Sequence, residues 1–298
     1  MSSYHEPVLL HDAIIGLNIL ENGCYVDATF GGGGHASEIL NHLESGHLIG
    51  FDQDEDARPN IPDDSRFTFV DKNFRHLKRF LKLHGHTGID GILADLGVSS
   101  FQINTPERGF STRFEGTLDM RMNTSAALSA ADVIETYSQK QLQNVLGEYG
   151  EVRNARTLTE AIVKERYNRP IQTIEDLKEV VLPLSKGNQN RYLAQVFQAL
   201  RIEVNDEMNA LKEFLEQSLE VLKPGGRLVV ISYHSLEDRL VKRFMKTGTF
   251  EDDVESDLFG NRPQPFKLIT RKPIVANEKE LKSNPRSRSA KLRIAEKK

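Results

Sequence analysis

The chain contains 298 residues, of which 38% are hydrophobic, enough for one large domain or two ordinary domains with a normal core. Its formal net charge of −4 excludes a basic field over the whole surface, so any nucleic-acid site must be a local patch. The single cysteine, Cys24, excludes an internal disulfide framework and a multi-cysteine zinc site. No other ligand spacing predicts a metal site.

No segment predicts export or membrane insertion. Residues 1–7 lack the cationic stretch and apolar core of a signal peptide. No run of about 18 apolar residues occurs, so no membrane-spanning helix is expected. We therefore expect a cytoplasmic protein with no membrane partner.

The first part of the chain alternates strand and helix patterns. Helices are expected at 7–20, 36–43 and 74–83, and strands at 25–30, 47–51, 66–70 and 89–95. This alternation is typical of α/β proteins with a doubly wound, parallel sheet. The pattern returns later, with a helix over 205–222 and a buried strand over 227–232.

The middle of the chain lacks strand alternation. Helices are expected at 131–135, 139–149, 155–166, 174–182 and 191–203. Ser138 and Thr173 stand where N-caps belong. We therefore expect an all-helical insertion over 105–205, within a discontinuous α/β domain formed by 1–104 and 206–298.

Four consecutive glycines, Gly31 to Gly34, join the first strand to the next helix. Such a turn lets a ligand touch bare backbone at a helix N-terminus. Asp52 ends the second strand 21 residues after Gly31, about the spacing of an acid that binds ribose hydroxyls. The two features predict a nucleoside-containing cofactor. The glycine pattern fits both a dinucleotide and S-adenosylmethionine (SAM).

Further polar residues follow the ends of other expected strands. Asp71, Asp95 and the segment 233–235 should share one edge of the sheet with Asp52, where open α/β sheets bind ligands. Ser99, in the loop after Asp95, offers a hydroxyl there. Histidine side chains transfer protons near neutral pH, which makes His234 a candidate for that role, although a lone histidine is often only a structural hydrogen-bond partner.

The C-terminal segment 271–298 is basic, with ten Lys and Arg against three Glu. A run of charge is usually a solvated face. In a protein with another reason to meet RNA, it becomes a candidate for phosphate contacts.

Several long motifs resemble one family. They lie at 31–35, 52–54, 95–100, 106–111, 118–122, 196–207, 234–239 and 284–293. In order and nearly end to end, they are similar to motifs of the bacterial 16S rRNA cytosine-N4 methyltransferases, the RsmH (MraW) family. The resemblance implies a class I SAM-dependent methyltransferase fold, Rossmann-like, with a mostly parallel seven-stranded sheet and a helical substrate-recognition insertion.

The same resemblance implies SAM as the cofactor and N4 of a cytidine in the decoding region of 16S rRNA as the target. By position, the SAM contacts would be Gly32, Gly33, Gly34, His35, Asp52, Phe74, Asp95 and Gln102. The partner would be free 16S rRNA or the small ribosomal subunit, and the chain would act as a monomer or homodimer.

For the chemistry, we expect Asp95 to accept a hydrogen bond from the target amine, with Ser99 or His234 assisting. Cys24 precedes the first strand, at the end away from the cofactor, so methylation at a ring carbon through a cysteine is not expected. Candidate phosphate contacts are Arg108, Arg113, Arg121, Arg191, Arg239, Arg286, Arg288 and Lys291. Arg201 could instead be paired with Glu203 or Asp206.

Three alternatives stay open from the sequence. A nicotinamide-dependent dehydrogenase shares the glycine turn and the ribose acid. A SAM-dependent enzyme could methylate another nucleic-acid amine, or DNA. A non-catalytic RNA-binding protein of ribosome assembly could retain the fold.

Overall fold

The computed structural model describes residues 7–251 and 264–298. It divides into a sheet unit, Met1–Gly97 with Met208–Lys298, and a helical unit, Val98–Glu207. The helical unit thus begins at 98 rather than at 105, and the sheet unit resumes at 208 rather than at 206. The expectation about a signal peptide rests mainly on residues 1–6, outside the described residues.

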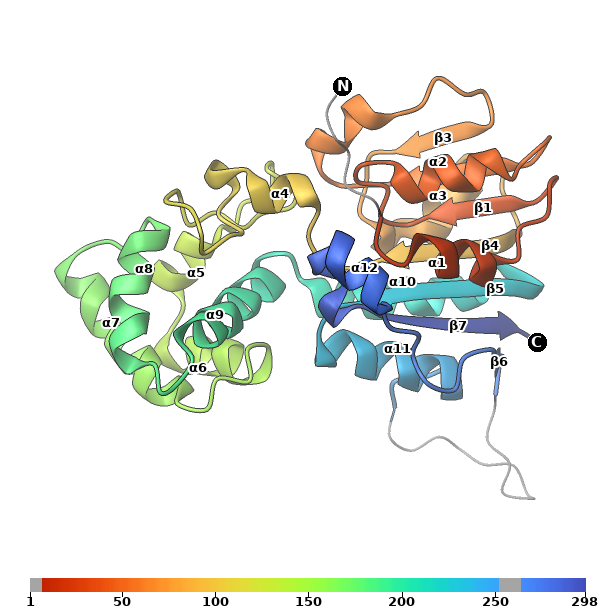
Figure 1. The fold of residues 1–298 in the computed structure, drawn as a ribbon. Helices are drawn as coiled ribbons and strands as arrows, with labels where there is room; N and C mark the ends of the chain where they lie inside the picture. The colour runs from red at the N-terminus through yellow and green to blue at the C-terminus, as the bar shows by residue number, and fades with distance from the viewer. Residues whose placement is uncertain (1–6, 252–263) are drawn as a thin grey trace, which may run out of the picture. The chain divides into compact units, whose positions relative to one another are not determined.

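The sheet unit is built on a seven-stranded sheet in the described part of the chain, in the order β3-β2-β1-β4-β5-β7-β6 (Figure 1). The strands are β1 (Cys24–Asp27), β2 (His47–Phe51), β3 (Phe67–Val70), β4 (Ile89–Asp95), β5 (Leu222–Ser232), β6 (Phe266–Leu268) and β7 (Lys291–Lys297). The pairings among β1 to β5 are parallel, whereas β7 is antiparallel to both β5 and β6. The sheet is therefore mostly parallel, as expected.

Helices cover both faces of the sheet, because side chains alternate along each strand. Tyr25 of β1 packs in one apolar cluster and Val26 in another. The first cluster includes residues of α1 (Leu10–Leu17) and α2 (Gly34–Asn41). The second includes residues of α3 (Leu77–Leu83), α10 (Glu207–Val221) and α11 (Ser235–Thr247). All five parallel strands send their carboxyl ends to one edge, where the functional residues gather.

The basic C-terminal segment, for which the sequence left open a solvated face or phosphate contacts, is partly buried in the sheet. Its last part is β7, which lies between β5 and β6. Leu292 and Ile294 are buried against one face of the sheet and Ala295 against the other. Arg293 is only 6% exposed, and its Nε donates to Oδ1 of Asp238 at 2.6 Å. The count of charged residues did not reveal the alternating apolar positions that make the last part of this segment a strand. Ahead of it, α12 (Glu278–Ser283) is a short helix.

The helical unit has its own apolar core. Its helices are α4 (Ser100–Asn104), α5 (Ala130–Thr136), α6 (Gln139–Glu148), α7 (Ala155–Asn168), α8 (Ile174–Val181) and α9 (Gln189–Val204). Ser138 and Thr173 begin α6 and α8 as capping boxes with Gln141 and Asp176, which confirms both predicted N-caps. An isolated β-bridge between Thr117 and Thr173 is a small departure from an all-helical unit.

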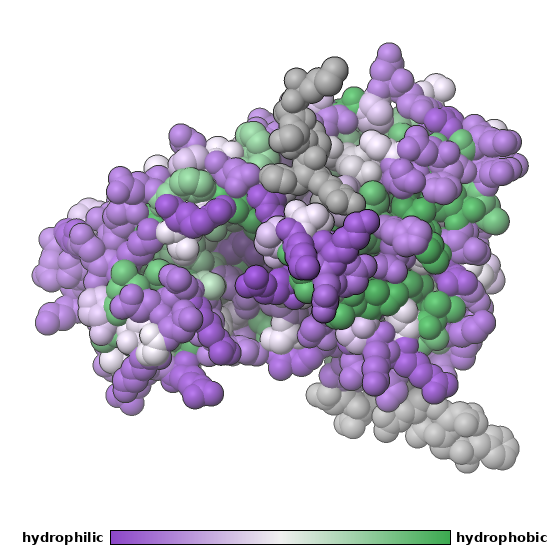
Figure 2. Space-filling view, in the orientation of Figure 1, coloured by the Kyte–Doolittle hydropathy of each residue, from purple (hydrophilic) through white to green (hydrophobic). Residues whose placement is uncertain are grey.

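The surface agrees with the polar composition. Figure 2 shows hydrophilic side chains over much of the face that it draws. Within the described ranges, no helix combines the length and apolar character needed to cross a bilayer.

Candidate active site

The glycine turn connects β1 to α2 and leaves backbone open to a ligand. Gly33 is the N-cap of α2 with φ of +75°, a left-handed conformation that glycine adopts without strain. A Cβ on Gly34 would lie 2.3 Å from Cγ of Pro7, so a side chain does not fit there. Nδ2 of Asn60 donates to the Gly31 carbonyl at 3.0 Å and holds the turn. Gly32 is exposed between them.

Asp52 lies against this turn. Its Oδ2 accepts the backbone N–H of Gly31 at 2.7 Å, and its Oδ1 accepts that of Asp54 at 2.9 Å. Burial raises the pKa of Asp52 to about 6, despite these two hydrogen bonds. Gly31 and Asp52, which the spacing of 21 residues suggested as parts of one site, are thus in direct contact.

Asp95 ends β4 and is held from three sides. Its backbone N–H donates to Oγ1 of Thr29 at 2.7 Å. The hydroxyl of Tyr233 donates to its Oδ1 at 2.7 Å, and its Oδ2 lies 3.9 Å from Nδ1 of His35. The carboxyl is 22% exposed. Burial is the largest of the effects that raise the pKa of Asp95, to about 7, so the group stands near its midpoint at neutral pH.

His35 beside Asp95 is a neutral histidine. Its Nε2 lies 3.1 Å from the Val8 carbonyl, which can only accept, so Nε2 carries the proton. Burial lowers the pKa of His35 to about 4. Its Nδ1 therefore has a lone pair and no proton. The 3.9 Å approach of Nδ1 to Oδ2 of Asp95 is not an ion pair at neutral pH. When Asp95 is ionised, two acceptors therefore face each other there, and an N–H donor placed between them would satisfy both.

Asp27, the last residue of β1, is a site residue that the sequence analysis missed. It is 1% exposed, and its Oδ1 accepts the Thr29 N–H at 3.1 Å. Its Oδ2 has no hydrogen-bond partner among the described residues. Burial, opposed by the hydrogen bond from Thr29 and reinforced by the nearby Asp52, raises its pKa to about 7. The sequence does contain a signal for this residue, because Asp27 is an acid within the apolar run that leads into the four glycines.

Phe74 follows β3 at the same edge of the sheet. It opens a short 3₁₀ helix, Phe74–His76, and its ring packs edge-to-face on Phe214 with 5.1 Å between centroids. Nδ2 of Asn73 donates to Oε1 of Gln53 at 3.0 Å and ties the loop after β3 to the loop after β2. The half-buried ring of Phe74 leaves part of its surface open beside this loop.

The remaining predicted residues act as helix caps. His234 is the N-cap of α11, where its Nδ1 accepts the Glu237 N–H at 3.4 Å and its Nε2 lies 3.1 Å from Oε1 of Glu237. Nδ1 of His234 is thus engaged at the start of its own helix, whereas Nε2 has no hydrogen-bond partner among the described residues. Ser99 and Gln102 form the capping box of α4 and belong to the helical unit.

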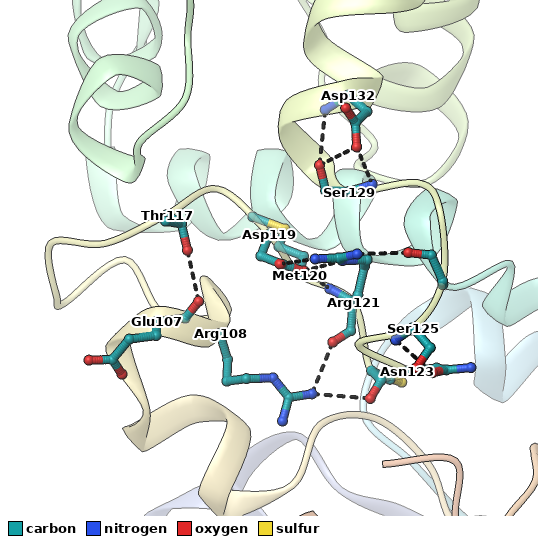
Figure 3. Close-up of polar contacts among 12 residues, drawn as sticks. Glu107, Arg108, Thr117, Asp119, Met120, Arg121, Asn123, Ser125, Ser129 and Asp132 are labelled. Atoms are coloured by element: carbon teal, nitrogen blue, oxygen red, sulfur yellow. Dashed lines mark hydrogen bonds and ion pairs between the residues drawn. The ribbon is translucent and has the colours of Figure 1, made fainter. Parts of the chain in front are cut away.

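Two candidate phosphate contacts make hydrogen bonds within the helical unit (Figure 3). Arg108 is 8% exposed, and its Nη2 donates to the carbonyls of Arg121 and Met122 at 3.0 and 3.1 Å. The guanidinium of Arg121 binds both carboxylate oxygens of Asp119, at 2.8 and 2.7 Å. Its Nη1 also donates to the Ala126 carbonyl at 2.7 Å. Both side chains hold the loop that leads into α5.

The other candidate cations differ in exposure. Arg286 and Lys291 are partly buried, and Nζ of Lys291 lies 3.4 Å from Oδ2 of Asp238. The guanidinium of Arg201, for which the sequence left open a phosphate contact or a pair with Glu203 or Asp206, binds both carboxylate oxygens of Glu207, at 2.8 and 2.9 Å. The exposed candidates are Arg113, Arg191, Arg239 and Arg288.

Cys24 lies at the far end of β1 from the glycine turn, as its first residue. Burial raises the pKa of its thiol to about 11, so the thiol is neutral at physiological pH. A cysteine that attacks a substrate needs thiolate character and access to the reacting atoms. Neither the position nor the protonation state of Cys24 meets this need.

Comparisons with known proteins agree with the motifs. A sequence profile of the MraW methylase family matches residues 2–298. The ribosomal RNA small subunit methyltransferase H of Phocaeicola vulgatus is 60% identical over 296 residues, which cover 99% of this chain and 97% of that protein. The protein of the same name from Flavobacterium johnsoniae is 57% identical over 296 residues, with 99% and 98% covered.

A solved structure of an rRNA methylase from Streptococcus thermophilus is also similar. It is 12% identical, covers 96% of this chain and 94% of its own, and gives a TM-score of 0.41. The family match rests on the sequence profile and on the two relatives above, which extend over nearly the whole chain.

Proposed function

We propose that this chain, which belongs to the MraW methylase family, uses SAM to methylate the exocyclic N4 of a cytidine in 16S rRNA. The relatives named as ribosomal RNA small subunit methyltransferase H support the rRNA of the small subunit as the target. The observation that carries the proposal is the pair of acceptors, Oδ2 of Asp95 and Nδ1 of His35, 3.9 Å apart beside the glycine turn. An amine N–H satisfies both.

The residues at this edge fit SAM. Asp27, Asp52 and Asp95 all have raised pKa values, so a ligand that brings positive charge would offset their mutual repulsion. When bound, SAM supplies a methyl group on a positively charged sulfur. The turn over Gly32–Gly34 and His35 would hold its methionine part, and Asp52 its ribose. Phe74 would border the adenine, and Gln102 is the last of the contacts that the resemblance implies.

Asp95 would prepare the amine and take its proton. The lone pair of a cytosine amine is delocalised into the ring, so the amine is a poor nucleophile. A hydrogen bond from the amine to Oδ2 of Asp95 increases the electron density on nitrogen and stabilises developing positive charge. With a pKa of about 7, Asp95 is ionised often enough to accept the proton, yet basic enough to keep it. Ser99 and His234 keep supporting roles, through the helix starts that they cap.

The target base must leave its stack to reach this edge, as bases do in other enzymes that modify them. The helical unit is our candidate for holding the RNA. Phosphate contacts would come from the exposed arginines, chiefly Arg113, Arg191, Arg239 and Arg288, with Arg286 and Lys291 adding positive charge. We place the enzyme in the cytoplasm, as a monomer or homodimer, acting on free 16S rRNA or on the small subunit.

The test is transfer of labelled methyl from SAM to small ribosomal subunits that lack the modification, with nucleoside analysis of the product. We expect N4-methylcytidine. A labelled nucleoside of another kind would reassign the substrate to a different nucleic-acid amine. SAM binding without any transfer to rRNA, free or assembled, would overturn the proposal in favour of a non-catalytic role in ribosome assembly.

A further inference from the structure

The phenol of Tyr233 is in direct contact with the proposed proton acceptor. Its hydroxyl donates to Oδ1 of Asp95 at 2.7 Å, although the two residues are 138 positions apart. The contact follows from the sheet, because β4 and β5 are parallel neighbours with Asp95 opposite Ile231. Tyr233 stands two residues beyond that pair, just past the end of β5.

The backbone and ring of Tyr233 are both held in place. Its N–H donates to Oε2 of Glu237 at 2.8 Å, within the first turn of α11. On the other side, a Cβ built on Gly97 would lie 3.4 Å from Cδ2 of the ring, so the ring packs against that backbone. The hydroxyl therefore meets Asp95 from a fixed direction.

The phenol is the donor to the ionised carboxylate in this contact. Burial, together with the charge of Asp95 and the hydrogen bond to it, raises the pKa of Tyr233 well above its usual value of 10.0. The hydroxyl thus keeps its proton throughout the physiological range and occupies Oδ1 of Asp95. Oδ2, which faces Nδ1 of His35, is the oxygen left for a substrate.

We propose that Tyr233 is a positioning residue for the methyl transfer: its hydroxyl holds Oδ1 of Asp95 and thereby directs Oδ2 to the substrate amine. This inference rests on the proposed function. Tyr233 acts through Asp95 and does not touch the reacting atoms in this role.

The charges around Asp95 make the effect of the phenol measurable. Asp27 of β1 and Glu237 of α11 raise the pKa of Asp95, while His35 of α2 is neutral. The hydrogen bond from Tyr233 is the interaction at this carboxyl that lowers its pKa. Without that hydroxyl, the pKa of Asp95 moves up from about 7 and the ionised fraction at pH 7 falls.

The test is Tyr233→Phe, which keeps the ring and removes only the hydroxyl. We expect the acid limb of the pH profile of kcat to move to higher pH and kcat at pH 7 to fall by about three- to tenfold. Part of the loss should be recovered at pH 9, and SAM affinity should be unchanged. Unchanged kcat and an unchanged acid limb would overturn the proposal.

A matched control and a second readout complete the design. Tyr137→Phe removes an equivalent contact, from a phenol to Oε1 of Glu203 at 2.7 Å in the helical unit, and should leave the acid limb in place. Infrared difference spectra can follow the protonated carboxyl band of Asp95, assigned with Asp95→Asn. If Tyr233→Phe shifts this titration but neither enzyme methylates rRNA, the proposed function fails and the contact stands. An unshifted titration overturns the role of Tyr233.

Discussion

Oδ2 of Asp95 and Nδ1 of His35 lie 3.9 Å apart, and both are hydrogen-bond acceptors when Asp95 is ionised. The tautomer of His35 is fixed at the other side of its ring, because Nε2–H, the one N–H of the neutral imidazole, donates to the Val8 carbonyl. At the end of a parallel sheet, beside a glycine turn, such a pair is poised for an N–H donor.

Asp95→Asn tests this relationship. The amide can still accept from Tyr233 at Oδ1, but its NH₂ group now satisfies Nδ1 of His35 and cannot take a proton. We expect kcat to fall by about 10²- to 10³-fold at saturating SAM, with SAM affinity changed only a few-fold. Single-turnover methylation and calorimetry measure the two effects.

The matched control is Asp90→Asn on the same strand. Asp90 accepts the Cys24 N–H and pairs with Lys223 at the other end of β4, so kcat should be nearly unchanged. Near-normal turnover of Asp95→Asn would remove the proton-acceptor role from this residue.

Asp52→Ala tests the cofactor side of the site. The variant loses the proposed partner of the ribose hydroxyls and the acceptor for the Gly31 N–H, which orders the turn. We expect the Kd for SAM to rise by about 10- to 100-fold, since each hydrogen bond to a charged group contributes about 1.5–3 kcal/mol. Calorimetric titration with SAM gives the value directly.

Asp71→Ala is the control for Asp52→Ala, because Asp71 also follows a strand but forms a partly exposed ion pair with Arg58. Its Kd for SAM should match that of the unmodified chain. Equal weakening by both substitutions would show a general effect of removing acids, and not a ribose contact.

Asp27→Asn tests the pH dependence of stability. The pKa of Asp27 is about 7 in the folded chain, against an ordinary value of 3.8. Between these values the folded state keeps a proton that the unfolded chain releases, so this group stabilises the fold at low pH. That stabilisation is lost as the pH rises to about 7. Asn keeps an acceptor for the Thr29 N–H and carries no charge, so we expect it to raise the free energy of unfolding at pH 8 by roughly 1–3 kcal/mol.

Denaturant unfolding of the ligand-free chain at pH 5 and pH 8 measures the change. The expected gain is largest at pH 8 and falls by more than half at pH 5. Glu44→Gln, at an exposed position, should behave like the unmodified chain at both values. A loss of stability at pH 8 in Asp27→Asn would mean that the charged carboxylate is satisfied in the folded state.

Arg108 and Arg191 separate folding from RNA binding. Arg108→Ala leaves the carbonyls of Arg121 and Met122 without their donor in a buried loop, and should cost about 2–3 kcal/mol of stability. Arg191→Ala removes an exposed cation at the start of α9. This variant should keep the melting temperature of the unmodified chain and bind RNA more weakly. The slope of log K against log salt concentration should become smaller by about one, the contribution of one phosphate contact. An unchanged salt dependence would take Arg191 out of the RNA interface.

The sequence predicted the features that depend on neighbours along the chain. Strands 47–51 and 89–95 have the bounds that their apolar patterns indicated, and the capping boxes at Ser138 and Thr173 are complete within four residues. The contact between Asp52 and Gly31 follows from one strand–turn–helix–strand unit. Short spacings translate directly into geometry when regular elements connect them.

Only the tertiary structure decided what depends on distant segments. Asp95 and Tyr233 are 138 positions apart, the segment between them includes the whole helical unit, and no local spacing relates the two side chains. Part of the basic C-terminal segment is the buried strand β7, which lies between β5 and β6. Arg108 is buried and donates to backbone carbonyls. Burial also set the protonation of Asp27, Asp95 and His35. The sequence by itself determined the elements and the residue types at the edge of the sheet. Packing determined which of their atoms meet and which of them carry charge, because desolvation and long-range pairing exist only in the folded chain.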